Sequence, residues 1–210
     1  MVKAFTTNML GENCYVFSNN GEAVIIDCGA YSERQWLPIK KHIEDEHLTL
    51  RYCLLTHAHF DHIYGLAFVY RDFGISPQCH QLDVQLYNIA DNTSMSLMGE
   101  PFPNPQPDLG ANLFDGQKLQ LGDVEIEVLH TPGHTLGGVC FYIEKEGILF
   151  SGDTLFAGSV GRTDLPGGSM SQEINSIRNR ILVLPSETKI YPGHGSYTTI
   201  EFEKDNNPYF

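Results

Sequence analysis

The sequence lacks any long apolar run and any closely spaced pair of cysteines. No stretch of its 210 residues approaches the roughly 18 apolar residues of a membrane-spanning helix. The first residues, M-V-K-A-F-T-T-N-M-L-G-E-N, do not contain the apolar core of a signal peptide. The five cysteines are scattered and odd in number, which is typical of buried thiols in a reducing compartment. We therefore predict a cytoplasmic protein with no membrane partner.

Positive charge is also scarce. Lys and Arg number 13 against 26 Asp and Glu, which gives a net charge of −13 at pH 7 with neutral histidines. No basic stripe offsets this charge, and a polyanion would be repelled at long range. We therefore expect no nucleic acid partner, and a nuclease function is disfavoured. A chain of this length with 41% hydrophobic residues can bury one core, so we predict a single domain over residues 1–210.

Strand and helix patterns alternate in both parts of the chain. In the first third, two β-rich runs flank N-N-G, an amphipathic segment follows, and a buried run leads directly to His57. The second part repeats this pattern after residue 124. We predict strands over 14–18, 23–27, 51–56, 125–129, 139–143, 148–151 and 189–191, and helices over 31–47, 63–73 and 170–184.

Residues 91–117 interrupt this pattern. The stretch contains four prolines and shows little periodicity, yet it carries apolar residues such as Met95, Met98 and Phe102. Loops longer than about 12–15 residues in a compact domain are often functional lids or disordered segments. We predict an inserted lid loop here, with a plain surface insertion as an equal alternative.

Histidine and aspartate gather in short motifs that follow predicted strands. In T-H-A-H-F-D-H (56–62), the side chains of His57 and His59 point the same way where the chain is extended, so they can bind one ion together. Asp61 and His62 lie where the chain bends toward the next helix, and can face a neighbouring site. Further candidate ligands stand in the motifs H-T-P-G-H-T, S-G-D-T and Y-P-G-H-G, at His134, Asp153 and His194.

Seven candidate ligands are too many for one metal ion. A tetrahedral zinc takes four ligands, and a catalytic zinc takes three and a water molecule. Seven can serve two ions if one carboxylate bridges them. Imidazole and carboxylate without thiolate suit zinc, iron or manganese, whereas closed structural zinc sites are usually rich in cysteine. The sequence predicts a dinuclear hydrolytic centre with two divalent metal ions, Zn²⁺ first, with Fe or Mn as alternatives.

These motifs resemble those of the metallo-β-lactamase superfamily over nearly the whole chain. The resemblance rests on T-H-x-H-x-D-H at 56–62, G-H-T at 133–135, G-D-T at 152–154 and G-H-G at 193–195. It implies an α/β fold, the four-layer αβ/βα sandwich. It also implies one metal on His57, His59 and His134, a second on Asp61, His62 and His194, and Asp153 as the bridge. The run V-I-I-D-C-G is similar to an early strand-end motif of the family, which makes Asp27 a supporting residue.

Residues 151–169 look like the glyoxalase II branch, above all its short bacterial members. The implied reaction is hydrolysis of a small acyl thioester, similar to S-lactoylglutathione, by a hydroxide shared between the metals, with Asp61 holding that hydroxide in line. Where family members place a lysine and a tyrosine for glutathione, this chain has Arg162 and Asp164. Arg162 is a candidate to bind a substrate carboxylate. An ion pair with Asp164 is the equal alternative.

Two other reactions fit parts of the same pattern. Persulfide dioxygenases resemble this branch and use a single iron, so a mononuclear-iron oxidoreductase is the alternative function. Hydrolysis of β-lactams is disfavoured because those enzymes are exported and no export signal is expected here. The sequence does not specify the acyl group, the thiol or the oligomeric state.

Overall fold

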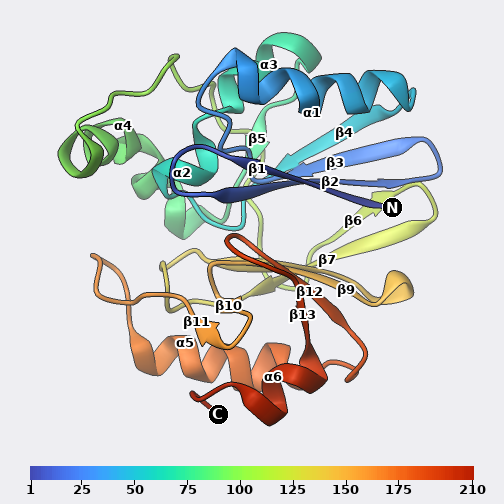
Figure 1. Ribbon diagram of the computed structural model, residues 1–210, viewed down its shortest axis with the longest axis vertical. Helices are drawn as coiled ribbons and strands as arrows, with labels where there is room; N and C mark the ends of the chain where they lie inside the picture. Colours follow the sequence, from blue (N-terminus) through green and yellow to red (C-terminus); the bar gives the residue numbers. More distant parts are fainter.

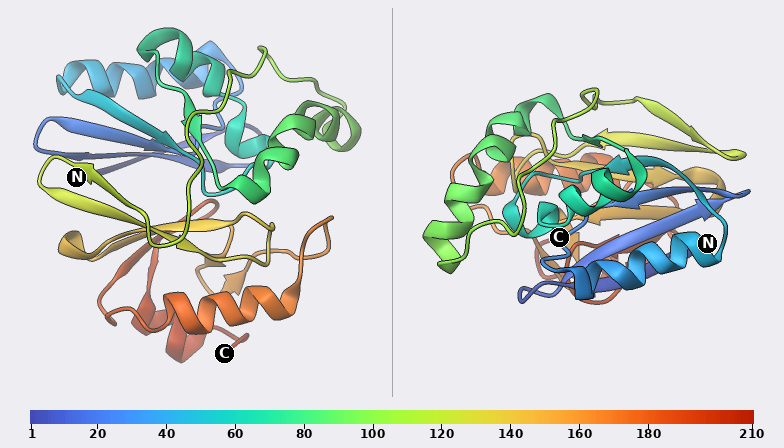
Figure 2. Two further views of the ribbon diagram at one scale, coloured as in Figure 1. Left: turned by 180° about the vertical axis from the view of Figure 1, so that it is seen from behind. Right: turned by 90° about the horizontal axis from the view of Figure 1, so that it is seen from above.

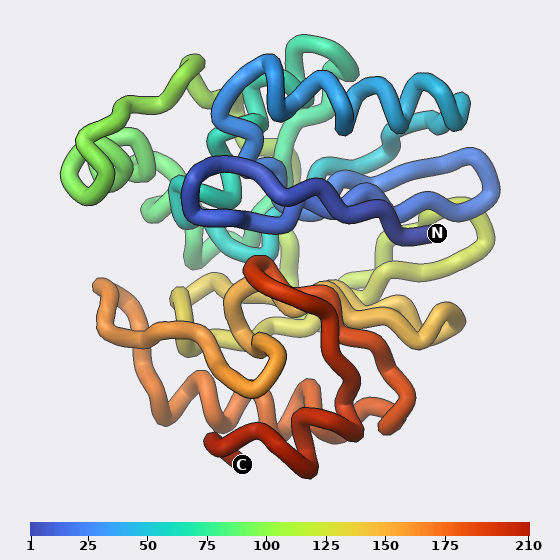
Figure 3. The backbone as a smooth tube through the Cα atoms, in the orientation of Figure 1, coloured from blue at the N-terminus to red at the C-terminus, as the bar shows by residue number.

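Two β-sheets lie face to face, with helices on both outer faces (Figure 1). The computed structural model describes all 210 residues. One sheet has five strands in the order β1-β2-β3-β4-β5, and the other has six in the order β13-β12-β9-β8-β7-β6. The N-terminal part of the chain forms the upper half of the molecule and the C-terminal part forms the lower half (Figure 3). This arrangement confirms the four-layer αβ/βα sandwich.

The strands are β1 Val2–Thr7, β2 Glu12–Asn19, β3 Glu22–Ile26, β4 Thr49–Leu54, β5 Pro77–Gln78, β6 Lys118–Leu121, β7 Val124–His130, β8 Val139–Ile143, β9 Ile148–Gly152, β10 Leu155–Phe156, β11 Ser159–Val160, β12 Lys189–Pro192 and β13 Thr198–Thr199. The helices are α1 Glu33–Asp45, α2 Phe60–Ile63, α3 Leu66–Phe73, α4 Val84–Met98, α5 Met170–Ser176 and α6 Ile200–Asn206. Strands β10 and β11 form a separate antiparallel ribbon.

Three apolar clusters fill the three interfaces between the four layers. The central strands are apolar on both faces because both faces are buried. Between the sheets, Phe17 and Ile26 of the first sheet meet Phe141 and Phe150 of the second. A second cluster, which includes Trp36, fastens α1 and α3 to the first sheet. A third fastens α5 and α6 to the second sheet.

Parallel pairing places three functional loops at one edge of the sandwich. Strand β4 pairs parallel with β3, and β12 pairs parallel with β9. The carboxyl ends of β4, β9 and β12 lead into the motifs at residues 56–62, 152–154 and 193–195. Because parallel strands end on the same side, the motifs after β9 and β12 lie together, and the motif after β4 meets them from the other sheet, where His62 Nε2 is 3.4 Å from Asp153 Oδ1.

The predicted lid begins later than expected. Residues 91–98 belong to α4, so treating them as irregular was wrong; the irregular part is the segment 99–117, which links the two halves of the molecule (Figure 2). The run D-N-T-S has low intrinsic helix propensity. Tertiary contacts override it, because the Ser94 hydroxyl lies 2.6 Å from Tyr64 Oη and donates to the Glu100 carbonyl at 2.7 Å. A lid function stays a prediction.

Two of the predicted helices are subdivided. The segment 63–73 is split between α2 and α3, because Gly65 donates its N–H to the Cys28 carbonyl and a side chain there would meet Cys28 Sγ. The segment 170–184 is α5 followed by a π-helical turn, Ile177–Ile181. None of the helices combines the length and the apolar character that crossing a membrane would require.

Candidate metal centre

The motif T-H-A-H-F-D-H changes conformation in its middle. Strand β4 ends at Leu54, the chain bends at Thr56, and His59 is extended, with φ and ψ of −69° and 147°. Helix α2 then begins at Phe60 and carries Asp61 and His62. His57 and His59 therefore precede the helical turn, whereas Asp61 and His62 lie within it; the helix begins three residues earlier than the predicted start at residue 63.

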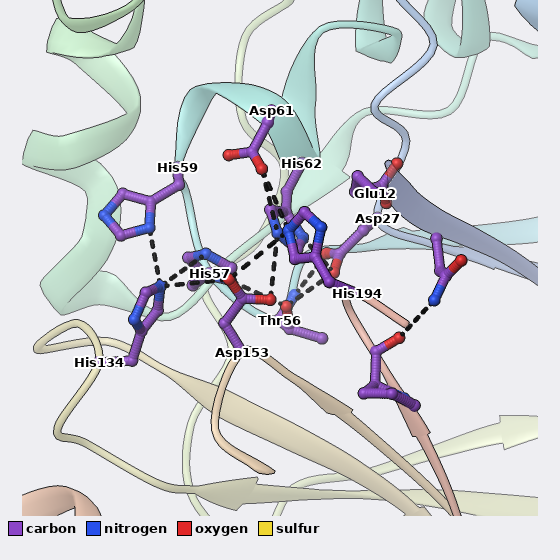
Figure 4. Close-up of polar contacts among 12 residues, drawn as sticks. Glu12, Asp27, Thr56, His57, His59, Asp61, His62, His134, Asp153 and His194 are labelled. Carbon is purple, nitrogen blue, oxygen red and sulfur yellow. Dashed lines mark hydrogen bonds and ion pairs between the residues drawn. The ribbon is translucent and has the colours of Figure 1, made fainter. Parts of the chain in front are cut away.

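Three histidines form the first ligand group, made of His57, His59 and His134. His134 Nε2 lies 3.2 Å from His57 Nε2 and 2.9 Å from His59 Nδ1 (Figure 4). Nitrogen ligands on one tetrahedral zinc, each at 2.0–2.1 Å, stand about 3.3 Å apart. The three nitrogens are therefore spaced as ligands of a single ion.

The second ligand group consists of Asp61, His62 and His194. Asp61 Oδ2 lies 3.2 Å from His194 Nε2 and 3.8 Å from His62 Nε2. Asp61 and His62 are buried, while His194 is partly exposed. This group adjoins the first, since the ring centroids of His57 and His62 are only 4.1 Å apart.

Asp153 lies between the two groups. Its Oδ1 is 3.4 Å from His62 Nε2, while its Oδ2 is 3.6 Å from His134 Nε2 and 3.7 Å from His194 Nε2. One carboxylate thus faces ligands of both groups. The seven predicted ligands all meet in one place.

Two of the histidines donate a hydrogen bond from the ring nitrogen that points away from the other ligands. In a neutral imidazole, this leaves the nitrogen that faces the other ligands as an acceptor. His134 Nδ1 donates to the Arg162 carbonyl at 2.7 Å, and His194 Nδ1 donates to the Leu10 carbonyl at 3.2 Å. Neutral imidazoles held this way direct lone pairs toward the centre. The buried atoms His62 Nε2 and Asp153 Oδ1 have no hydrogen-bond partner. Converging lone pairs repel unless a cation lies between them, so these residues fit the two metal ions implied by the sequence.

Burial and neighbouring charges shift the pKa values of the candidate ligands, toward the metal-binding form for His59 and Asp153 and away from it for His62. Burial, assisted by His134, lowers the pKa of His59 to about 3, so its imidazole is neutral. Burial alone would raise the pKa of Asp153, but His62 and its other histidine neighbours outweigh burial and lower it. Without a metal, burial lowers the pKa of His62, yet Asp153 and Asp61 more than reverse this and raise it well above its ordinary value. Metal binding at this group would therefore release a proton.

Asp27 forms hydrogen bonds with two residues of the motif at 56–62. Its Oδ2 accepts from His62 Nδ1 at 2.9 Å and from the Thr56 hydroxyl at 2.7 Å, while its Oδ1 accepts from Thr56 N at 2.8 Å. Thr56 Oγ1, whose proton goes to Asp27, lies 3.0 Å from His57 Nδ1. The φ of Asp27 is 52°, a left-handed conformation that is strained for a residue other than glycine. Asp27 therefore orients one histidine from each ligand group.

Sequence reasoning missed two buried carboxyl groups, which belong to Asp83 and Glu173. Asp83 Oδ2 accepts from Ala58 N at 3.1 Å and from the Thr135 hydroxyl at 2.9 Å, and its Oδ1 accepts from Gly137 N at 2.7 Å. It thereby ties the loop that carries His57 and His59 to the loop that carries His134.

Glu173 Oε2 accepts from His134 N at 2.8 Å, and burial raises the pKa of this carboxyl to about 8. No local motif marks Asp83 or Glu173. The only trace of them in the sequence is two glycines that lie next to them in space. A side chain at Gly133 would clash with Glu173, and one at Gly137 would crowd Asp83.

Arg162 approaches the centre through its backbone alone. Its side chain is exposed and forms an ion pair with Asp164, with Nε 2.8 Å and Nη2 2.9 Å from the two carboxylate oxygens. Its carbonyl accepts from His134 Nδ1. The structure therefore contains the ion pair between Arg162 and Asp164, and a contact of the guanidinium with substrate stays a prediction.

Known proteins are similar to this chain in sequence and in fold. A family model described as the metallo-beta-lactamase superfamily matches residues 8–194. The hydroxyacylglutathione hydrolase GloC of Haemophilus influenzae is 36% identical over 94% of this chain and 92% of its own length. The structure of the BLEG-1 B3 metallo-beta-lactamase is 40% identical, with a TM-score of 0.87 over all of this chain and 99% of the other. TTHA1623, in a di-iron-bound form, is 37% identical with a TM-score of 0.87 over the full length of both chains. The chain therefore belongs to the metallo-beta-lactamase superfamily.

Proposed function

We propose that this protein is a dinuclear metallohydrolase that cleaves a small acyl thioester similar to S-lactoylglutathione. The observation that carries the proposal is the placement of Asp153, whose single carboxylate faces ligands of both groups. Hydrolases use such paired sites to hold a nucleophile and a substrate together. The similarity to GloC of Haemophilus influenzae supports a thioester as the substrate.

Two divalent metals bound by these residues would lower the pKa of a water molecule to near neutrality and polarise the thioester carbonyl. Zn²⁺ suits the mixed imidazole and carboxylate ligands, and the di-iron form of TTHA1623 makes iron the second choice. The protein's own contribution is to hold both ligand groups in a fixed geometry. Hydrogen bonds on the outer nitrogens prevent the imidazoles from rotating.

Asp61 is the residue to which we assign the orientation of the attacking water. Burial would raise its pKa, but His62 and the hydrogen bond with His194 outweigh burial and lower it. Its carboxylate is therefore ionised at neutral pH and can accept a hydrogen bond from water. Because Asp61 sits in the first turn of α2, its backbone cannot shift without moving His62 as well.

The reducing compartment belongs to the same proposal. All five cysteines are free and buried. Burial raises the pKa of Cys53 and of Cys140, which keeps these thiols protonated and unreactive. A cytoplasmic hydrolase of a thioester is consistent with thiols that need no disulfide.

A second candidate function is hydrolysis of β-lactams. The specific observation in its favour is the 40% identity to the BLEG-1 B3 metallo-beta-lactamase over the whole chain. The same pair of metal sites can attack an amide or a thioester carbonyl, so the metal centre does not discriminate between these substrates. The mononuclear-iron persulfide dioxygenase differs in metal count and in its need for oxygen.

Elemental analysis combined with rate measurements tests the proposal. We expect two metal ions per chain, and hydrolysis of S-lactoylglutathione far faster than that of a chromogenic cephalosporin. Asp61→Ala and His59→Ala should abolish this hydrolysis while the far-ultraviolet circular dichroism stays unchanged. Asp45→Ala, which removes an exposed carboxylate of α1, is the control and should retain full activity.

Three results would overturn the proposal. A faster rate with the cephalosporin would favour the β-lactamase function. One iron per chain with oxygen uptake on glutathione persulfide would favour the dioxygenase. Normal turnover by the Asp61 variant would refute the assigned role of that residue.

A further inference from the structure

Glu173 carries a buried carboxyl group that destabilises the fold. Its side chain is inaccessible to solvent, and it lies in α5, outside the sheets. Only one of its oxygens has a partner: Oε2 accepts from His134 N, whereas Oε1 is buried without any hydrogen bond. A buried carboxyl with an unpaired oxygen is destabilising relative to an apolar side chain of the same shape.

A second buried glutamate shows what a carboxyl held for stability looks like. Glu203 of α6 is equally inaccessible. Its two oxygens accept hydrogen bonds from Gly158 N, from the Thr198 hydroxyl and from Asn207 Nδ2. Glu203 touches none of the seven candidate ligands in these contacts. The two glutamates therefore differ in hydrogen bonding and not in burial.

The position of Glu173 explains why its cost is tolerated. His134 is held at two points, by Glu173 at its backbone N–H and by the Arg162 carbonyl at its ring Nδ1, 2.8 and 2.7 Å away. The residue before Arg162 is Gly161, where a side chain would lie 2.9 Å from Glu173 Oε1 and would clash with the Asp153 carbonyl. The Glu173 carboxyl thus packs between the His134 loop and the segment 161–162 that holds the His134 ring.

Loop packing around Glu173 reinforces this contact. Ser169 N donates to the Gly133 carbonyl at 2.7 Å, and the Ser176 hydroxyl donates to the Pro132 carbonyl at 2.7 Å. Helix α5 is therefore docked on the His134 loop at both of its ends. Glu173 is the only one of these contacts that reaches the backbone of a candidate metal ligand.

We propose that Glu173 is a positioning residue that holds His134 in the first ligand group, and so sets the metal affinity of that group at the expense of fold stability. The inference rests on the metal centre of the proposed function and not on the choice of substrate. Its effect should be confined to the group of three histidines, because Asp61, His62 and His194 form their hydrogen bonds and ion pairs with residues other than Glu173.

Binding of Co²⁺ tests this role independently of activity. The two groups differ in ligands, three imidazoles against two imidazoles and a carboxylate, so stepwise Co²⁺ titration by visible spectroscopy with chelator competition can separate them. Glu173→Met keeps the length of the side chain and removes the acceptor. Glu173→Gln keeps an acceptor oxygen for His134 N. Glu203→Gln is the matched control for altering a buried glutamate.

We expect Glu173→Met to weaken Co²⁺ binding at the three-histidine group by about 10–100-fold and to leave the other group within about threefold. Glu173→Gln should restore most of the affinity, and Glu203→Gln should change neither group. The metal-free Glu173→Met protein should unfold at the same or a higher urea concentration than the metal-free parent, because its unpaired oxygen is gone.

Four results would overturn the proposal. Parental affinity of Glu173→Met at both groups would show that the contact does not matter. An equal loss at both groups, or a Glu173→Met protein that is less stable or does not fold, would assign Glu173 a structural role. A Glu173→Gln protein as impaired as Glu173→Met would show that the acceptor oxygen is not what counts. Loss of S-lactoylglutathione hydrolysis alone would bear on the proposed function and not on this one.

Discussion

Replacing Asp83 with asparagine should loosen the contact between the two loops that carry the first ligand group. Asp83 accepts three hydrogen bonds from groups in both halves of the chain, at Ala58, Thr135 and Gly137. An asparagine has one acceptor oxygen and one donor nitrogen. If its oxygen replaces Oδ2, the Ala58 and Thr135 bonds survive while Gly137 N faces a second donor.

The expected magnitude follows from this count. One buried donor without a partner costs about 1–3 kcal/mol. For a chain of this length, each kcal/mol lowers Tm by roughly 2–4 °C. We therefore expect Asp83→Asn to lose about 1–3 kcal/mol of unfolding free energy. Asp83→Ala, which leaves all three donors unpaired, should lose roughly 3–5 kcal/mol, because water entering the space limits the sum.

Urea unfolding of the metal-free protein is the appropriate assay, because bound metal would add its own stabilisation. The control is Asp91→Asn in α4, an exposed carboxylate that accepts only from Phe102 N and should change stability by less than about 0.5 kcal/mol. If Asp83→Asn were as stable as this control, Asp83 would not hold the two loops together. The reasoning would also fail if Asp83→Ala cost no more than Asp83→Asn.

Three further predictions concern the surroundings of the centre. Asp27→Asn should weaken metal binding by about 10–100-fold, because His62 Nδ1 and Thr56 compete for one remaining acceptor; chelator competition measures this, and unchanged affinity would refute it. The pKa of Glu173 is about 8 in the folded protein against an ordinary value near 4.5, so the free energy of unfolding is highest below pH 4.5, where the carboxyl is protonated in both states, and falls as pH rises to 8. The metal-free Glu173→Gln protein should therefore gain up to about 4 kcal/mol over the parent between these limits, and parallel pH profiles in urea unfolding would contradict the assignment. Arg162→Ala should leave metal content and Tm unchanged, because the side chain makes only an exposed ion pair; a tenfold rise in KM for the thioester would instead identify Arg162 as a substrate contact.

The candidate ligands could be predicted because each follows a strand in a short motif. His57 and His59 differ by two residues in extended chain, so their common direction follows from backbone geometry. Asp153 and His194 come directly after strands that pair in parallel, and parallel strands bring their carboxyl ends together. The resemblance of these motifs to the metallo-β-lactamase superfamily implied the four-layer sandwich, which the structure confirms.

The supporting residues could not be predicted, because nothing local distinguishes them. Asp83 is 25 residues from Ala58 and 54 from Gly137, so its role arises only when the two halves pack together. Glu173 looks like a solvent-facing residue of a helix with Gln172 before it, and only its burial reveals its partner. Helix α4 was partly missed for a related reason, because its Asn, Thr and Ser residues are stabilised by tertiary contacts and not by propensity.

Each of the two ligand groups takes residues from both halves of the chain. The first group takes two histidines from the loop after β4 and one, His134, from the other half of the chain. The second group likewise takes Asp61 and His62 from one half and His194 from the other. Each metal would therefore span the edge where the sheets meet, and neither half holds a complete group by itself. Asp83 joins the same halves by hydrogen bonds alone, so the loops are already held in place before a metal binds. Ligands fixed in advance lose less conformational entropy on binding, and this is the advantage that offsets burying Asp83 and Glu173 in a fold that apolar residues would stabilise better.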